Sequence, residues 1–207
     1  MVAMGGLKKA LSRLVPLTLL WCGIIGDGCD HFFPASGTYI GVPLRSTPQG
    51  VVTQFQNAYQ NISLSLYQDL LPTDGSFKFY VAPGFVAENP VSLTQEPWDT
   101  TMHYVGGFPY YYYWTQDIEL KSEYALFENA LAMQFITPLS IAQSRQIIDS
   151  LGNIDSEVQV TGELYITFND PDTYPNQDIL INCDFLLTRD SKNLWVIKKW
   201  YDLQGSS

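Results

Sequence analysis

The chain has 207 residues, of which 46% are hydrophobic and 15% charged. This composition is ordinary for a globular domain and excludes a largely disordered chain. The formal net charge is -10 at pH 7 and becomes about -12 without residues 1–28, which hold Lys8, Lys9, Arg13 and Asp27. Because a surface of that sign repels a polyanion, the sequence argues against a nucleic-acid partner.

The first 28 residues have the layout of a signal peptide. Three basic residues precede an apolar run over residues 14–25, which is too short to span a bilayer as a helix. The sequence Gly26-Asp27-Gly28-Cys29 follows this run. It resembles the lipobox of bacterial lipoproteins, in which a cysteine after small residues is acylated and becomes the first residue of the mature protein.

Cys29 is the predicted lipidation site. It departs from the lipobox at Asp27, where a small neutral residue is preferred, and at Gly26, where Leu, Val or Ile is preferred. Cys22 is an alternative, although the bulky Trp21 directly before it is the larger departure, and simple cleavage without a lipid is another. Every alternative predicts an exported protein. Acylation would hold it on a membrane of the bacterial cell envelope, on the periplasmic or the surface side.

The remainder of the chain divides into a tether, one domain and a tail. Residues 29–45 are rich in Pro, Gly and Ser and are interpreted as a tether, residues 46–203 as the domain, and residues 204–207 as a short tail. If Cys29 is acylated, Cys183 is left as a lone thiol in the domain. The cysteines therefore indicate neither a disulfide framework nor a metal site.

The domain begins with two helix signals and a strand. Thr47-Pro48 starts a helix with one apolar face that extends to Ile62, and Ser63 starts a short helix that ends before Pro72. Residues 77–81 alternate as a strand. Residues 85–109 contain several Pro and Gly and are predicted to form a long loop.

Five aromatic residues follow in succession at positions 110–114. They cannot all face one core, so at least two must reach solvent, a cavity or a partner. The functional interpretation is a patch that faces a ligand or partner; the alternative is a strand or helix lead-in with tyrosine hydroxyls in water. The candidate ligand- or partner-binding residues are Tyr59, Tyr110, Tyr111, Tyr112, Tyr113, Trp114 and Trp200.

A third helix is predicted from Gln116 to about Asn129, with Thr115 as its cap. One apolar stripe at helical spacing is expected to face the core, formed by Leu120, Tyr124, Phe127 and Leu131. The acids of this segment are expected on a solvated face: Asp117, Glu119, Glu123 and Glu128.

The last part of the domain is rich in strands. Residues 131–138 alternate, residues 140–151 satisfy neither period well, and residues 158–168 and 180–188 form half-buried strands. Residues 194–203 are expected to close a curved sheet, because Trp, Tyr, Val and Ile suit a pleated, half-buried surface. The last three strands form an antiparallel meander.

The order of these elements resembles the nuclear transport factor 2-like superfamily, also called the cystatin-like cone. The resemblance covers residues 46–203 and is carried by residues 47–52 with Ala58-Tyr59, by the second helix, and by Trp195-Val196-Ile197 with residues 200–203. It implies an α+β fold with three helices, in which a strongly curved antiparallel sheet wraps a long N-terminal helix and leaves a conical pocket. Some members of the family use that pocket for catalysis and others for binding or assembly, so the fold alone does not define a function.

The sequence contains no catalytic, cofactor or metal motif that supports an enzyme. His31 and His103 have no Cys or acidic partner at ligand spacing, and no phosphate loop or nucleophile elbow is found. Three hypotheses remain, ranked here in order. The first is a lipid-anchored, non-catalytic domain that binds a small apolar or aromatic ligand or a partner protein. The second is a structural homodimer of the envelope. The third is an isomerase- or cyclase-like enzyme, which needs an acid and a tyrosine that face each other deep in the cone.

Overall fold

The computed structural model describes residues 44–81, 93–96, 104–105, 108–110, 112–148 and 152–203. The chain separates into two compact units, Met1–Pro43 and Leu44–Ser207, and all described residues belong to the second. The predicted signal peptide, the lipidation site Cys29 and its alternative Cys22 therefore lie outside the described residues, as do Tyr111 and His103. None of the described helices is long and apolar enough to cross a membrane.

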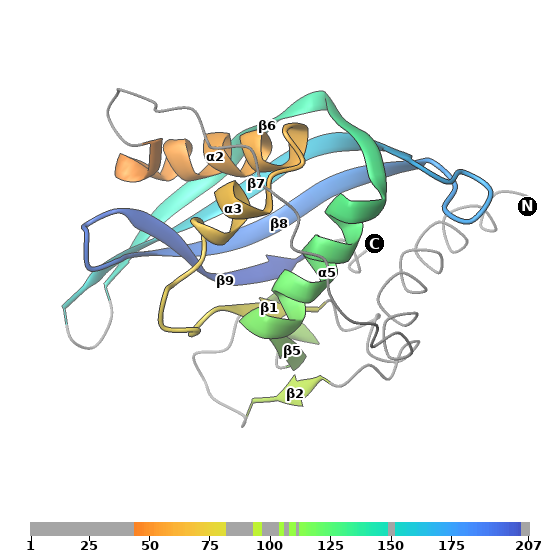
Figure 1. The fold of residues 1–207 in the computed structure, drawn as a ribbon. Coiled ribbons are helices and arrows are strands. Elements are labelled where there is room, and N and C mark those ends of the chain that lie inside the picture. Colours follow the sequence, from red (N-terminus) through yellow and green to blue (C-terminus); the bar gives the residue numbers. More distant parts are fainter. Residues whose placement is uncertain are drawn as a thin grey trace, which may run out of the picture. The chain divides into compact units, whose positions relative to one another are not determined.

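The described unit combines helices with one large sheet (Figure 1). Its helical segments are η2 (Leu44–Ser46), α2 (Pro48–Gln60), α3 (Leu64–Gln68) and α5 (Gln116–Asn129). The short strands are β1 (Lys78–Tyr80), β2 (Thr94–Gln95), β3 (Tyr104–Val105), β4 (Phe108–Pro109) and β5 (Tyr112–Thr115). The long ones are β6 (Ala130–Ile148), β7 (Ile154–Phe168), β8 (Gln177–Arg189) and β9 (Trp195–Asp202).

Local signals in the sequence fix where the helices begin. The Thr47 hydroxyl accepts a hydrogen bond from the Gly50 amide at 3.1 Å, and Pro48 follows at the first helical position. The Ser63 hydroxyl accepts from the Leu66 amide at 3.4 Å and starts α3. Thr115 precedes α5 without a side-chain capping bond, so only the position of that predicted cap is confirmed.

The sheet has the strand order β2-β5-β1-β9-β8-β7-β6. β6, β7, β8 and β9 pair antiparallel in succession, which confirms the predicted meander. The last strand was expected to close the sheet, but β9 lies inside it, because its second edge pairs with β1 in parallel. β7 and β8 alternate between buried and half-buried positions, as expected of strands with one face on a core.

β6 is longer than the sequence indicates. It continues through Pro138 and over residues 139–148, where no clear period was found. Its pairing with β7 contains several register shifts, and each shift moves the following side chains to a different face. β6 is also an edge strand, where a proline costs no ladder hydrogen bond. The predicted loop over 85–109 holds the short strands β2, β3 and β4 within its described part.

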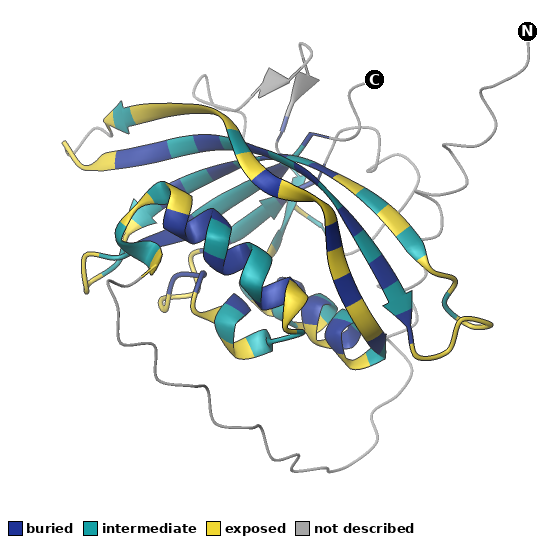
Figure 2. Ribbon diagram, turned by 90° about the horizontal axis from the view of Figure 1, so that it is seen from above, coloured by how far each residue is buried: buried dark blue, intermediate teal, exposed yellow. Residues whose placement is uncertain are grey.

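The helices cover one face of the curved sheet, and the buried positions lie between these two layers (Figure 2). The main core joins α2 and α3 to the inner residues of β6–β9; among the side chains with almost no exposure are Val51, Phe55, Val158, Ile166 and Phe185. The sheet remains open, with β2 and β6 at its edges. The predicted α+β class is confirmed, with three α-helices in the described part and a curved sheet that is antiparallel except for the β1–β9 pair.

Candidate functional site

The buried face of α5 is acidic. Glu119 and Glu123 are one turn apart on this helix and retain only 2% and 9% of their exposure. Phe127 continues the same buried stripe, whereas Tyr124 and Leu131 are exposed. The prediction of an inward-facing stripe that included Tyr124 and Leu131 is therefore wrong, as is the prediction that Glu119 and Glu123 belong to a solvated face. Only Asp117 and Glu128 are exposed as expected.

Glu119 accepts hydrogen bonds on both carboxyl oxygens. The Tyr67 hydroxyl, from α3, donates to Oε1, and the Trp114 indole Nε1, from β5, donates to Oε2 at 2.5 Å. Tyr67 is fully buried and Trp114 is half-buried. Two donors on one carboxyl group satisfy it in the ionised form, in which it can only accept.

Glu123 is only half satisfied. The Tyr59 hydroxyl, from the last turn of α2, donates to its Oε1 at 2.7 Å. Its Oε2 is buried and has no hydrogen-bond partner in the described part of the chain. A buried polar atom without a partner costs about 1–3 kcal/mol, so this oxygen requires an explanation.

Aromatic rings surround the acid pair. The Tyr59 ring stacks on Phe55 with a centroid distance of 4.7 Å and meets Phe127 edge-on at 5.3 Å. The Tyr67 ring lies 5.9 Å from Tyr59 and is also edge-on. Next to Glu119, the Trp114 ring stacks on Phe79 at 4.4 Å. This environment has a low polarity and strengthens every electrostatic interaction inside it.

Burial dominates the protonation of this group of residues. Burial, together with the nearby Glu119 charge, raises the pKa of Glu123 to about 8 against the opposing effect of the Tyr59 hydrogen bond. Burial also raises the pKa of Glu119, against the hydrogen bonds from Tyr67 and Trp114. The pKa values of both tyrosines are raised by burial and by the two carboxyl groups, so both hydroxyls stay protonated. Near neutral pH the pair therefore favours a neutral Glu123 beside Glu119.

This arrangement permits two kinds of chemistry at Glu123 Oε2. In its neutral form Glu123 can donate a hydrogen bond to a carbonyl or hydroxyl oxygen, and in its ionised form it can accept a proton. Among the described residues, no group of three or more His, Cys, Asp or Glu side chains is placed so that it could hold a metal ion. Strongly perturbed carboxyl groups are more frequent at functional sites than elsewhere.

The structure brings two of the predicted binding residues to the acid pair, Tyr59 and Trp114. Trp200 is half-buried on the same inner face of the sheet, where its ring contacts Phe55 at 5.3 Å. Tyr110 and Tyr113 belong instead to a separate cluster on the outer face, with Tyr80, Tyr201 and Leu203. Tyr112 is half-buried on β5. Residues 112–114 of the aromatic run thus belong to β5, which leads into α5, and the described residues of the run divide between the two faces. The alternative interpretation expected tyrosine hydroxyls in water, but Tyr110 is buried and its hydroxyl donates to the Asp202 carbonyl oxygen at 2.7 Å.

Sequence reasoning missed Tyr67, Glu119 and Glu123. A weak signal for the acids was present: Glu119, Glu123 and Phe127 also share one face of a helix, at positions i, i+4 and i+8. A stripe with two acids and one phenylalanine is, however, normally the solvated one. What decides the orientation is the set of donors on α2, α3 and β5, which the local pattern does not contain.

Comparisons with known proteins add no argument about the function of this chain. The sequence matches no protein-family model and none of the curated proteins. Among solved structures, a conserved protein from Planctomyces limnophilus aligns with a TM-score of 0.47 and 7% identity, over 73% of this chain and 88% of that one. A ketosteroid isomerase-like protein from Erwinia carotovora atroseptica gives a TM-score of 0.45 and 11% identity, over 74% and 89%. A Streptomyces avermitilis protein from the nuclear transport factor 2-like family aligns with a TM-score of 0.42 and 16% identity. The alignment covers 74% of this chain and 92% of that one.

Proposed function

We propose that this protein binds a small molecule with an apolar ring body and one hydrogen-bonding group, which pairs with Glu123 Oε2. The observation that carries the proposal is the buried, unpartnered Oε2 beside Tyr59 and Glu119. A ligand hydroxyl or carbonyl would supply the missing partner, and the surrounding aromatic rings would contact its apolar part. Trp114, which donates to Glu119, is only half-buried.

The same proposal places the protein outside the cytoplasm. The signal-peptide layout and Cys29 support an exported domain that a lipid holds in the bacterial cell envelope, with residues 29–45 as its tether. Radiolabelled palmitate should be incorporated into the protein in a bacterial host. Cys29→Ser should abolish the labelling and Cys22→Ser should not; an unlabelled parent would contradict anchoring and leave the binding site untouched.

Ligand binding can be tested with 2-naphthol, a fluorescent aromatic ring with one hydroxyl group. We expect the exported protein to bind it and Glu123→Leu to lower the affinity about tenfold, since this substitution removes the hydrogen-bonding group and one hydrogen bond in a buried site has roughly that effect. Glu163→Leu, on the outer face of β7, is the matched control and should bind as the parent does. Equal affinity in the parent and Glu123→Leu would refute the site.

A second candidate function is proton transfer, as in an isomerase. It is favoured by a carboxyl group with a pKa of about 8 in contact with a buried tyrosine, because both protonation forms are then present near neutral pH. Ionised Glu123 would take a proton from the α-carbon of a β,γ-unsaturated ketone, the carbon between the carbonyl group and the double bond, and leave an enolate. The same carboxyl group would return the proton to the γ-carbon, so the double bond shifts and no oxidant is consumed.

The ketone 3-cyclohexen-1-one tests this candidate, because its conjugated isomer absorbs in the ultraviolet. An isomerase would convert it with a rate that Glu123→Gln lowers at least about 100-fold, the usual contribution of a general base. Glu163→Gln should convert the ketone at the rate of the parent. A parent rate no higher than that of buffer alone, or an unchanged rate in Glu123→Gln, would leave ligand binding as the function.

A further inference from the structure

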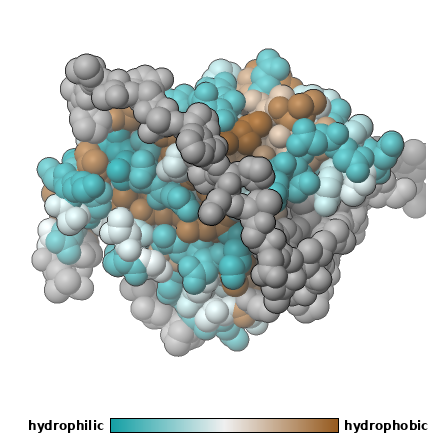
Figure 3. Space-filling view, viewed as in Figure 1, coloured by the Kyte–Doolittle hydropathy of each residue, from teal (hydrophilic) through white to brown (hydrophobic). Residues whose placement is uncertain are grey.

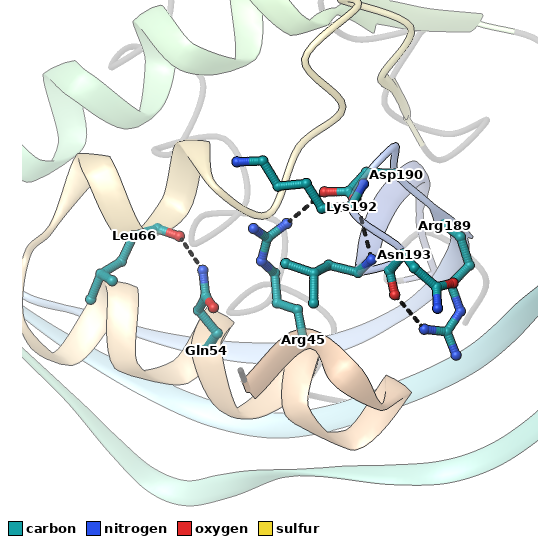
Figure 4. Close-up of polar contacts among 8 residues, drawn as sticks. Arg45, Gln54, Leu66, Arg189, Asp190, Lys192 and Asn193 are labelled. Carbon is teal, nitrogen blue, oxygen red and sulfur yellow. Dashed lines mark hydrogen bonds and ion pairs between the residues drawn. The ribbon is translucent and has the colours of Figure 1, made fainter. Parts of the chain in front are cut away.

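One end of the sheet gathers the starts and ends of four strands and the beginning of the domain. Ile148 and Ile154 form the last β6–β7 pair, and Arg189 pairs with Trp195 before the β8–β9 turn. Arg45 of η2 makes an ion pair with Asp190 of that turn at 3.7 Å (Figure 4). In Figure 1 the strand ends lie together at the left of the view. We call this the strand-end surface and define it by six exposed residues, Leu44, Arg145, Ile148, Ile154, Arg189 and Lys192.

Three of the seven exposed large hydrophobic residues in the described part of the chain lie on this surface. Ile148 and Ile154 retain 71% and 51% of their exposure although they face each other across two strands, and Leu44 retains 45%. Hydrophobic and hydrophilic residues both reach the surface at the left edge of the space-filling view (Figure 3). Ile148 and Ile154 are the last cross-strand pair of β6 and β7, and we call these two side chains the wedge.

Basic residues are exposed at this end of the sheet. Arg189 and Lys192 are exposed, and the Arg189 guanidinium donates to the Asn193 carbonyl oxygen at 2.6 Å. Arg145 is 67% exposed and is bonded to Glu157, and the exposed Asp74 interacts electrostatically with Lys198. The nearby carboxylates of Asp155, Glu157 and Asp190 retain only 7–14% and contact Lys198, Arg145 and Arg45. Asp149, between β6 and β7 in the sequence, lies outside the described residues.

Several of the basic residues of this acidic chain lie at this end of the sheet, and three of them form ion pairs with Asp190, Glu157 and Asp155. The chain has 11 basic residues, of which three precede residue 14, and Arg45, Arg145, Arg189, Lys192 and Lys198 are five of the other eight. Screening at physiological ionic strength acts over about 8 Å, so acids elsewhere in the domain weaken the local potential only slightly. The segment that precedes the domain joins it at Leu44, in the same surface.

We propose that the strand-end surface lies against an anionic phospholipid bilayer. Ile148, Ile154 and Leu44 enter the headgroup region, and Arg189 and Lys192 contact lipid phosphates. Apolar side chains flanked by Lys and Arg are what interfacial binding requires, and each basic residue near an anionic surface strengthens binding about fivefold. The inference deepens the proposed anchoring: the lipid would bring the domain to the membrane and this surface would orient it.

A fluorescent reporter at the wedge tests the proposal. The exported protein with Ile154→Cys is labelled with the environment-sensitive dye NBD and mixed with vesicles of equal phosphatidylglycerol and phosphatidylcholine. We expect the emission to rise roughly threefold and shift to the blue, as in an apolar medium. The matched control is Asp172→Cys, labelled in the same way in the exposed β7–β8 turn, where the emission should not change.

Adding Arg189→Gln and Lys192→Gln to the labelled protein should lower the equilibrium constant for insertion about 30-fold, and pure phosphatidylcholine should have a similar effect. No change at position 154, or an equal change at position 172, would overturn the proposal. A change without vesicles that grows with protein concentration would assign the surface to a second copy of the chain. Palmitate labelling at Cys29 is measured separately, so failure of the anchor and failure of this surface are distinguishable.

Discussion

Tyr59 and Glu123 are 64 residues apart in the sequence, yet the Tyr59 hydroxyl donates a hydrogen bond to Glu123 Oε1 at 2.7 Å inside the core. The bond ties the end of α2 to the middle of α5. It is also the one polar contact of Glu123 in the described structure, because Oε2 has none. Changes at either residue should therefore affect stability and protonation together.

Tyr59→Phe should lower the free energy of unfolding by about 1–3 kcal/mol. The substitution keeps the ring contacts with Phe55 and Phe127 but leaves both Glu123 oxygens buried without a donor. Urea titration at pH 7 measures the change. Tyr165→Phe, half-buried on the outer face of β7, is the matched control and should stay within about 0.5 kcal/mol of the parent. A loss no larger than that of the control would show that the bond contributes little.

The stability of the protein should fall as the pH rises from about 4.5 to 8. The pKa of Glu123 is raised to about 8 in the folded state, whereas in the unfolded chain it is near 4.3. Between these values the folded state holds the proton and the unfolded state does not, so each increase in pH favours unfolding. The stabilisation by protonated Glu123 is fully present below the pKa of the unfolded chain, and it is lost as the pH rises through the pKa of the folded state.

Glu123→Gln should remove most of this dependence, because an amide does not titrate. Unfolding free energies at pH 5, 6, 7 and 8 would show a flatter profile for this variant, with a gain of a few kcal/mol over the parent at pH 8. Glu128→Gln, exposed in the last turn of α5, removes a charge from the same helix and should leave the slope unchanged. Parallel profiles for the parent and Glu123→Gln would contradict the raised pKa.

Glu119→Gln should behave in the opposite way and destabilise the protein at neutral pH. Both Glu119 oxygens accept hydrogen bonds, so the amide nitrogen of a glutamine would face either the Tyr67 hydroxyl or the Trp114 indole, which both donate. A loss of about 1–3 kcal/mol is expected from urea titration at pH 7. A variant as stable as Glu128→Gln would show that Glu119 is neutral and acts as a donor itself.

The sequence predicts the strands and helices well where one face of an element meets the core. β7 and β8 follow their alternation residue by residue, and Thr47 and Ser63 begin α2 and α3 as expected. The long β6 was missed over residues 139–148, because its register shifts break the period on which such a prediction rests.

The candidate site could be predicted only in part. Tyr59 and Trp114 were selected as aromatic residues, but the acids that they contact were assigned to solvent. Two stripes lie one position apart on α5, one with Leu120 and Tyr124 and the other with Glu119 and Glu123. Hydrophobicity predicts that the first stripe is buried, whereas the structure buries the second. Tertiary donors reverse that choice, since a hydroxyl or indole that would otherwise be buried without an acceptor gains one from each carboxyl group.

Gly50→Ala should be among the most destabilising substitutions in the domain. A β-carbon at position 50 would lie 1.4 Å from the carbonyl oxygen of Leu44, and that neighbour is backbone, so η2 must move away from α2. The Arg45–Asp190 ion pair and the exposed position of Leu44 depend on the same segment. We expect a loss of more than about 2 kcal/mol in urea titration, whereas Thr53→Ala, on the partly exposed side of α2, should cost less than about 1 kcal/mol. Equal losses in the two variants would mean that η2 separates from α2 at little cost. Leu44 and Arg45 would then have no fixed position next to the strand-end surface.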